Sequence, residues 1–387
     1  MKPGKKAGIA LGVFSLVGLI LYFPILDNEF LSDDYDSLYR ICIEKTIIVK
    51  EFLRPLIDIS FKFNYFFSQL NCGGYYIFNL AVHIINAYLI YKIALTLKPR
   101  EHKTQQWFSW LSALLFLVYP FHNEGVVWLT GRLSTISCFF ALLSILVCLS
   151  NMKIFLKAFF TGLFYCIGLL AYESILLLPI IILLLIWNKE YSFKKTLISI
   201  IVCFAIIVLY LAVRYYASDV VYGEYGSRIT DNQFLNLFIK AFKTWGRLLL
   251  PPSENSNLLI GLFVLIMVII ILLNVQLYKM YGFLKLDTYI RLVLVLIIAM
   301  AIPTLFGIST RTSEGDRLLY FPSVFLCMIL SLVISLLVKT LKAKSVVCIA
   351  IGIYFISFLL LNNRNWKKPP VFQQQFYKAL VNLNRKM

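Results

Sequence analysis

The sequence predicts an all-α, polytopic membrane protein with about eleven transmembrane helices. Hydrophobic residues make up 60% of the 387 residues and charged residues only 14%. Apolar runs recur at lengths near the ~20 residues with which an α-helix crosses a bilayer. A net charge of +18 would suggest nucleic acid in a soluble protein, but here the cations lie mainly in short segments between apolar runs. We therefore expect no nucleic-acid partner.

The first predicted span covers Ala7 to Leu26 and follows three lysines, as the core of a signal peptide would. The apolar run is long, however, and it ends in Phe23-Pro24-Ile25-Leu26 without a small-residue cleavage site. We therefore expect this segment to be retained as the first helix.

Ten further spans follow from the apolar runs along the rest of the chain. They cover Tyr75–Leu97, Trp107–Phe121, Leu133–Leu149, Ile154–Ala171, Ser174–Trp187, Thr196–Arg214, Asn257–Leu277, Ile290–Ile308, Leu318–Val338 and Ser345–Leu361. In the first of these, polar residues suggest packing rather than chemistry. His83 and Asn86 share one helix face, and we expect them to form interhelical hydrogen bonds.

The charges orient these spans. With a cytoplasmic N-terminus, eighteen cations lie on the inner side against only Glu101, Glu190 and Asp287. The other sixteen of the 19 carboxylates lie outside, as the positive-inside rule expects. Eleven crossings then put the C-terminus outside. We expect a bacterial inner membrane with a periplasmic C-terminus, although the endoplasmic reticulum would satisfy the same topology.

Two outer segments, residues 27–74 and 215–256, are too long to be simple turns, and long loops often carry function. In the first, Pro55 is placed to begin a helix that runs through Tyr65. The same loop contains Cys42 and Cys72, which an oxidising compartment would allow to form a disulfide.

In the second segment, residues 234–250 predict an amphipathic helix in the membrane interface. Asn236, Lys240, Lys243 and Arg247 follow helical spacing on one face, where the cations would attract an anionic lipid head. Three cations in a span would each cost about 2.5–3.5 kcal/mol near the bilayer centre, which argues against a crossing. If this helix does cross, the number of spans becomes twelve. We assign residues 1–362 to one membrane domain and residues 363–387 to an outer tail.

A series of short motifs gives the sequence a family resemblance. Its members, in chain order, are Asp33-Asp34, Arg54-Pro55-Leu56, Phe78 to Asn86, Tyr119 to Arg132, Ala171-Tyr172-Glu173-Ser174, Arg317 to Ser323, and Asn363 to Lys367. The ordered set resembles the GT-C integral membrane glycosyltransferases, and within them the transmembrane and tetratricopeptide-repeat O-mannosyltransferases and their bacterial relatives. Two features depart from this group: Tyr172 stands where relatives often carry Lys, and no tetratricopeptide repeats occur before Met387.

The resemblance implies transfer of a sugar, such as mannose, from a polyprenyl-phosphate donor at the outer face. A glycan, lipid or protein hydroxyl would be the acceptor. The family's acidic motif in the first outer loop implies that Asp33 or Asp34 is the general base. Arg54, Arg132 and Arg317 are the candidates for binding the donor phosphate, because a guanidinium matches phosphate oxygens in charge and geometry.

His122 and Glu124 lie between the third and fourth spans, where they would hold the acceptor or orient an aspartate. No cofactor is expected to be required. The alternative is a divalent metal held by Asp33, Asp34, His122 and Glu124, because oxygen and imidazole ligands suit several such ions. A plain polar turn at His122 and Glu124, and a helix cap at the two aspartates, are the structural alternatives.

Two other functions remain open from the sequence. A flippase or another transporter of lipid-linked sugars would also be polytopic and basic, but transporters commonly place charged or broken helices near the midplane. Here the acids gather at helix ends and outer loops. A ligase or polymerase of lipid-linked glycans would share the site for the lipid phosphate, and only the order of the motifs favours a transferase of single sugars.

Overall fold

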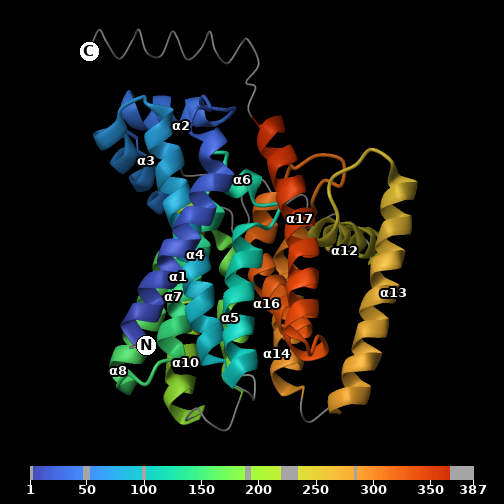
Figure 1. Cartoon of the computed structure of the whole chain (residues 1–387). Coiled ribbons are helices and arrows are strands. Elements are labelled where there is room, and N and C mark those ends of the chain that lie inside the picture. Colours follow the sequence, from blue (N-terminus) through green and yellow to red (C-terminus); the bar gives the residue numbers. More distant parts are fainter. Residues whose placement is uncertain are drawn as a thin grey trace.

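The computed structural model describes residues 3–46, 53–97, 102–187, 193–218, 234–282 and 286–366, and within these ranges all regular structure is helical (Figure 1). Long helices run side by side, and shorter helices collect near one end of the bundle. The predicted all-α, polytopic membrane fold is confirmed for the described part of the chain. The described chain begins and ends at opposite ends of the bundle, which fits an odd number of spans.

Each predicted span falls on helical structure. Seven described stretches are long and apolar enough to cross a membrane. They comprise α1 (Pro3–Tyr22), α4 (Cys72–Thr96), α10 (Phe193–Ser218), α13 (Ser256–Tyr281), α14 (Asp287–Ala299) with α15 (Ala301–Phe306), α16 (Tyr320–Leu337) and α17 (Leu341–Asn365). Shorter helices stand beside them: α5 (His102–Leu117), α7 (Arg132–Cys148), α8 (Ile154–Leu169) and α9 (Leu178–Ile186).

Prolines explain two differences from the predicted spans. Helix α5 ends at Leu117, before the expected Phe121. The reason is Pro120, which disfavours helical geometry in the preceding residue and lacks an N–H. The expected single helix over 290–308 divides at Met300, because Pro303 cannot donate to the Ala299 carbonyl and its ring would crowd that group.

The bundle interior contains a polar cluster that joins three helices. The hydroxyl of Tyr320 on α16 lies 2.6 Å from His83 Nδ1 on α4 and accepts a hydrogen bond from the Asn86 amide at 3.2 Å. The same amide donates to the Thr135 carbonyl of α7 at 2.9 Å. All four residues are fully buried. The interhelical hydrogen bonds predicted for His83 and Asn86 are confirmed.

Two short helices of the first outer segment cover one end of the bundle. Helix α2 (Asp34–Cys42) is joined to α3 (Pro55–Ser68) by Arg40, whose guanidinium contacts both oxygens of Asp58 at 2.7 and 3.0 Å. Helix α3 begins at Pro55, as predicted. Its outer face exposes apolar side chains at helical spacing, which suits a helix lying in the membrane interface. They are Ile59, Phe63, Phe66 and Phe67.

Helix α12 (Phe234–Leu249) lies crosswise to α13 in Figure 1, as expected for an interfacial helix. Lys243 is exposed on it and Lys240 is partly buried. Arg247, which was expected to attract an anionic lipid head together with these lysines, does not share their exposure. Arg247 is buried, forms an ion pair with Asp316, and lies over the ring of Phe121 at 4.2 Å. Asp316, 69 residues further along the chain, pairs with Arg247 in the protein interior.

The structure also bears on two smaller expectations. Cys42 and Cys72 are separate free thiols, so no disulfide joins them. Helix α17 continues to Asn365, where the amides of Asn362 and Asn363 donate to the carbonyls of Pro120 and Leu21. The expected tail at 363–387 lies mostly outside the described residues, so the domain boundary stays a prediction.

Loss of the buried ion pair should destabilise the fold. Asp316→Asn removes the negative partner of the buried Arg247, and breaking a buried pair costs about 3–5 kcal/mol. Asp287→Asn is the matched control, because Asp287 is 56% exposed in its pair with Arg291. We expect a clear fall in the thermal unfolding midpoint in detergent for Asp316→Asn and a much smaller one for Asp287→Asn. Equal midpoints for the two variants would contradict this.

Candidate active site

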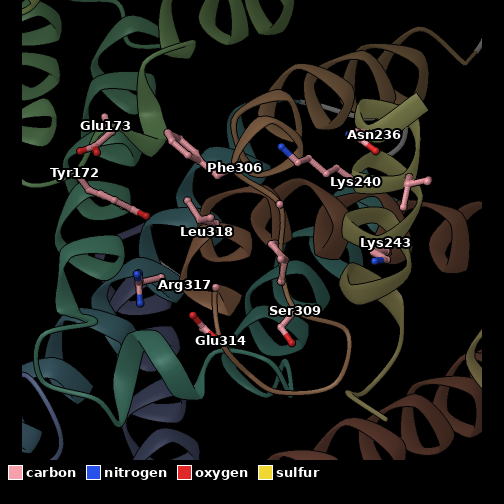
Figure 2. Close-up of a pocket in the computed structure, with 14 residues that line it drawn as sticks. Tyr172, Glu173, Asn236, Lys240, Lys243, Phe306, Ser309, Glu314, Arg317 and Leu318 are labelled. Atoms are coloured by element: carbon pink, nitrogen blue, oxygen red, sulfur yellow. The ribbon is translucent and has the colours of Figure 1, made fainter. Parts of the chain in front are cut away.

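A cavity of about 720 Å³ opens beside α12 (Figure 2). Its walls come from three parts of the chain: the turn between α8 and α9, helix α12, and the connection between α15 and α16. Figure 2 shows Lys240 reaching into the space from α12, with Tyr172 and Glu173 across from it. Lys240, Lys243 and Arg317 bring positive charge to the lining, and Glu173 and Glu314 bring negative charge.

The Glu173 carboxylate forms ion pairs with Arg54 and Arg214, which do not line the cavity. Arg54 donates to Glu173 through Nη2 at 2.8 Å and through Nε at 3.4 Å. Arg214 lies 3.7 Å from the same carboxylate. The Arg54 guanidinium also lies over the Tyr172 ring at 4.9 Å. Arg54 thus lies next to the cavity and fixes the Tyr172–Glu173 turn, but it does not line the cavity itself.

Another part of the wall, the connection between α15 and α16, is held by Glu124 on α6 (Asn123–Val126). Its buried carboxylate accepts hydrogen bonds from Arg317 Nη1 at 2.6 Å, from the Arg317 backbone N–H at 2.7 Å, and from the Gly315 N–H at 3.3 Å. Burial raises the pKa of Glu124, and Arg317 opposes that rise. Glu124 therefore orients the Arg317 guanidinium, which lines the cavity.

The two adjacent aspartates have different environments. Asp34 is fully buried; its Oδ1 accepts from the Thr130 N–H at 2.8 Å and from the Thr130 hydroxyl at 2.7 Å, and its Oδ2 accepts from the Leu31 N–H. Burial raises the pKa of Asp34 to about 6, although these hydrogen bonds and Arg132 oppose the rise. Asp33 is exposed and accepts a hydrogen bond from the Ser32 hydroxyl at 2.9 Å.

One short segment, residues 127–131, connects the aspartates with the cavity wall. Thr130 holds Asp34, and the Trp128 ring lies 5.0 Å from the Arg317 guanidinium. Gly131 packs directly on the backbone of Glu124, where an added Cβ would lie 1.8 Å from the carbonyl oxygen. The acidic loop and the cationic cavity therefore share this segment, although neither Asp33 nor Asp34 lines the cavity.

Arg132 lies inside the protein rather than at the cavity. Its Nη1 donates to Asn64 Oδ1 at 2.6 Å, and its guanidinium lies over the ring of Phe61 at 4.4 Å and near those of Phe78 and Tyr75. It is fully buried. This placement ties α3 to α7 and does not support the predicted phosphate contact.

His122 is also buried and does not line the cavity. Its Nε2 lies 2.7 Å from the Ser323 hydroxyl, and its ring packs on Tyr320 with centroids 4.4 Å apart. Burial and the neighbouring His83 hold the pKa of His122 well below its usual value. The four residues considered for a metal do not come together, and the described residues contain no group of three His, Cys, Asp or Glu side chains suited to a metal ion.

Several residues at the site had no role in the sequence prediction. Thr130 and Trp128 lie within a motif that carried the resemblance, but nothing in their spacing showed that one would hold Asp34 and the other Arg317. Arg214 was simply the end of a span, and it contacts Glu173 41 residues away. Helix α12 did give a usable signal, because its cations follow helical spacing.

Comparison with known proteins finds partial sequence matches to protein O-mannosyl-transferases. Protein O-mannosyl-transferase Tmtc1 of Drosophila melanogaster is 33% identical over 93 residues, which are 24% of this chain and 10% of that protein. A protein O-mannosyl-transferase of Caenorhabditis elegans is 24% identical over 174 residues, 40% of this chain and 25% of that protein. This chain is similar to protein O-mannosyl-transferases. Protein O-mannosyl-transferase TMTC3 of Mus musculus likewise matches at 33% over 94 residues.

The similarity to the O-mannosyltransferases that the ordered motifs suggested is thus confirmed. The matched parts make up only a tenth to a quarter of the relatives' own lengths. No family model matches the chain.

Gly131 should tolerate no side chain. In Gly131→Ala the new methyl group would meet the Glu124 carbonyl, so the backbone must shift, at a typical overpacking cost of about 1–3 kcal/mol. Gly352→Ala is the control, because no heavy atom lies within 4 Å of its Cβ position. We expect a lower thermal unfolding midpoint for Gly131→Ala alone. An unchanged midpoint would show that residues 127–131 do not need this close approach.

The buried Asp34 predicts a pH dependence of stability. A folded-state pKa raised from 3.8 to about 6 corresponds to roughly 3 kcal/mol of stabilisation, which is fully present below about pH 4 and is lost as the pH rises through 6. Asp34→Asn removes this titration. The unfolding midpoint of the wild type, relative to that of Asp34→Asn, should therefore fall between pH 4 and 6 and then level off. Parallel curves would contradict it.

Proposed function

We propose that this chain transfers a sugar, mannose in the first instance, from a polyprenyl-phosphate donor to an acceptor hydroxyl. The observation that carries the proposal is the cation-lined cavity beside α12, joined by residues 127–131 to an acidic outer loop. The similarity to protein O-mannosyl-transferases supports the same chemistry. It favours sugar transfer over transport of a lipid-linked sugar.

On the donor side, positive charge must meet the charge that develops on the departing phosphate. Lys240, Lys243 and Arg317 supply it from two walls of one cavity. Glu124 holds Arg317 in place, so that less side-chain entropy is lost when a phosphate binds. Arg54 acts indirectly, by fixing Glu173.

On the acceptor side, a carboxylate must take the proton of the attacking hydroxyl, because a neutral hydroxyl is a weak nucleophile. Asp33 is the better base of the two aspartates because its side chain is exposed to an incoming acceptor. Asp34 is a positioning residue: both of its oxygens hold the loop in place. The base abstracts the proton, the hydroxyl oxygen bonds to the anomeric carbon, and the bond from that carbon to the phosphate oxygen breaks.

The site is proposed to face away from the cytoplasm. The distribution of lysines and arginines supports this orientation. A bacterial inner membrane with a periplasmic site is our preferred location. The acceptor reaches the site from water and the donor from the bilayer.

The test is release of polyprenyl phosphate from polyprenyl-phosphate mannose by purified protein, with a panel of glycan, lipid and protein acceptors and with or without a chelator. Asp33→Asn should lower kcat by a factor of about 10²–10⁴, as expected for loss of a general base. Lys243→Gln should raise the donor KM roughly tenfold or more, because a hydrogen bond to a charged group contributes about 1.5–3 kcal/mol.

Lys342→Gln is the matched control. Lys342 is exposed at the start of α17, at the end of the bundle away from the cavity, and the same change there should leave KM unaltered. The proposal fails if no donor is consumed while lipid-linked sugar crosses proteoliposomes equally well in wild type and Asp33→Asn. That result would favour a flippase.

A further inference from the structure

A second hollow adjoins the cavity and differs from it in chemistry. It is a groove of about 390 Å³ between α12 and α13, and its lining also includes Pro251 and Thr310. Its lining is predominantly apolar. The apolar members are Phe238, Ile239, Phe242, Gly246, Leu250, Leu259, Ile260 and Phe263. The rings of Phe242 and Phe263 meet in it with centroids 4.6 Å apart.

The groove and the cavity share two lining residues, Ile239 and Lys243. The cavity carries positive charge from Lys240, Lys243 and Arg317. The cavity therefore suits an anion, the adjoining groove suits hydrocarbon, and Lys243 lies at their boundary. An amphiphile with an anionic head and an apolar chain matches this order of chemistry.

The groove also lies at the edge of the bundle. Helix α13 stands apart from the other long helices in Figure 1, and only 6% of its most apolar stretch is buried. Its apolar side chains therefore face lipid. The groove lies where α12 crosses beside α13, so a lipid can enter it sideways without leaving the bilayer.

We propose that the groove between α12 and α13 holds the hydrocarbon chain of the polyprenyl phosphate whose phosphate enters the neighbouring cavity. This inference rests on the proposed function. It assigns the chain to residues on α12 and α13 that no motif singled out. A single groove of this volume suits one chain better than the two acyl chains of a phospholipid. It encloses only the isoprene units nearest the phosphate.

The groove selects by shape rather than by hydrophobicity. Bilayer chains are as apolar as the lining, so burial alone gives little gain, and packing against the groove wall must decide. Gly246 sets the width of the groove: an added Cβ would lie 3.7 Å from Phe263, an ordinary contact, whereas a larger side chain would fill the space.

The test uses the full chain in nanodiscs and a probe, undecaprenyl phosphate with a photoreactive diazirine in the isoprene units nearest the phosphate. Light-induced labelling should map by mass spectrometry to α12 and α13 at the groove. Gly246→Phe should reduce labelling about tenfold, the factor given by 1.4 kcal/mol of lost binding. Gly246→Ala should reduce it less.

Gly261→Phe is the matched control, because Gly261 is exposed on α13, has open space around its Cβ position and does not line the groove. If Gly246→Phe does not fold, Ile260→Trp blocks the groove from the exposed side of α13, with Ile271→Trp as its control. Excess unlabelled undecaprenyl phosphate should displace the probe, and an equal amount of dioleoyl phosphatidylglycerol should not.

Labelling away from the groove, equal displacement by phosphatidylglycerol, or full labelling of both blocking variants would overturn the inference. Labelling needs no sugar transfer, so the two proposals fail separately. Groove labelling without mannose transfer would leave the lipid site standing and remove the proposed function. Mannose transfer with an unlabelled groove and an unchanged donor KM in Gly246→Phe would support the proposed function and remove the lipid site.

Discussion

The buried carboxylate of Glu124 is the interaction on which the site depends. A charge that loses its water must be paired and hydrogen-bonded inside the protein. Glu124 meets this requirement with the Arg317 guanidinium and two backbone N–H groups, which tie the α15–α16 connection to α6. Because Gly131 packs on the Glu124 carbonyl, the same residue also fixes the start of α7.

Contacts lead from Glu124 and Arg317 to two other parts of the structure. Trp128, which contacts Arg317, and Thr130 connect the site with the acidic loop. There both oxygens of Asp34 accept hydrogen bonds, and Asp33 is exposed. Asp316, next to Arg317, pairs with Arg247 and so connects the site with helix α12. The ion pairs Arg317–Glu124 and Arg247–Asp316 thus join distant parts of the chain around the cavity. The lysines of α12 complete its lining.

Helix α12 shows how one amphipathic segment can serve two environments. Lys240 and Lys243 line a cavity, and Phe238 and Phe242 line a groove that meets α13. A helix that lies crosswise at the bilayer surface can present both faces to different parts of one lipid, which a membrane-crossing helix cannot do. Pro251 and Pro252 follow this helix directly and favour its end there.

The sequence by itself determined the apolar helices, the separate helix near residues 234–250, the start of α3 at Pro55 and the hydrogen bonding of His83 and Asn86. These follow from apolar length, helical spacing and the fixed geometry of proline, all of which act within a few turns of helix. The tertiary structure alone decided which aspartate is buried, that Arg132 is internal, and that Arg247 pairs with Asp316. Those outcomes depend on which segments meet in space, and a buried charge takes whichever opposite charge or hydrogen-bonding group the packing brings within reach.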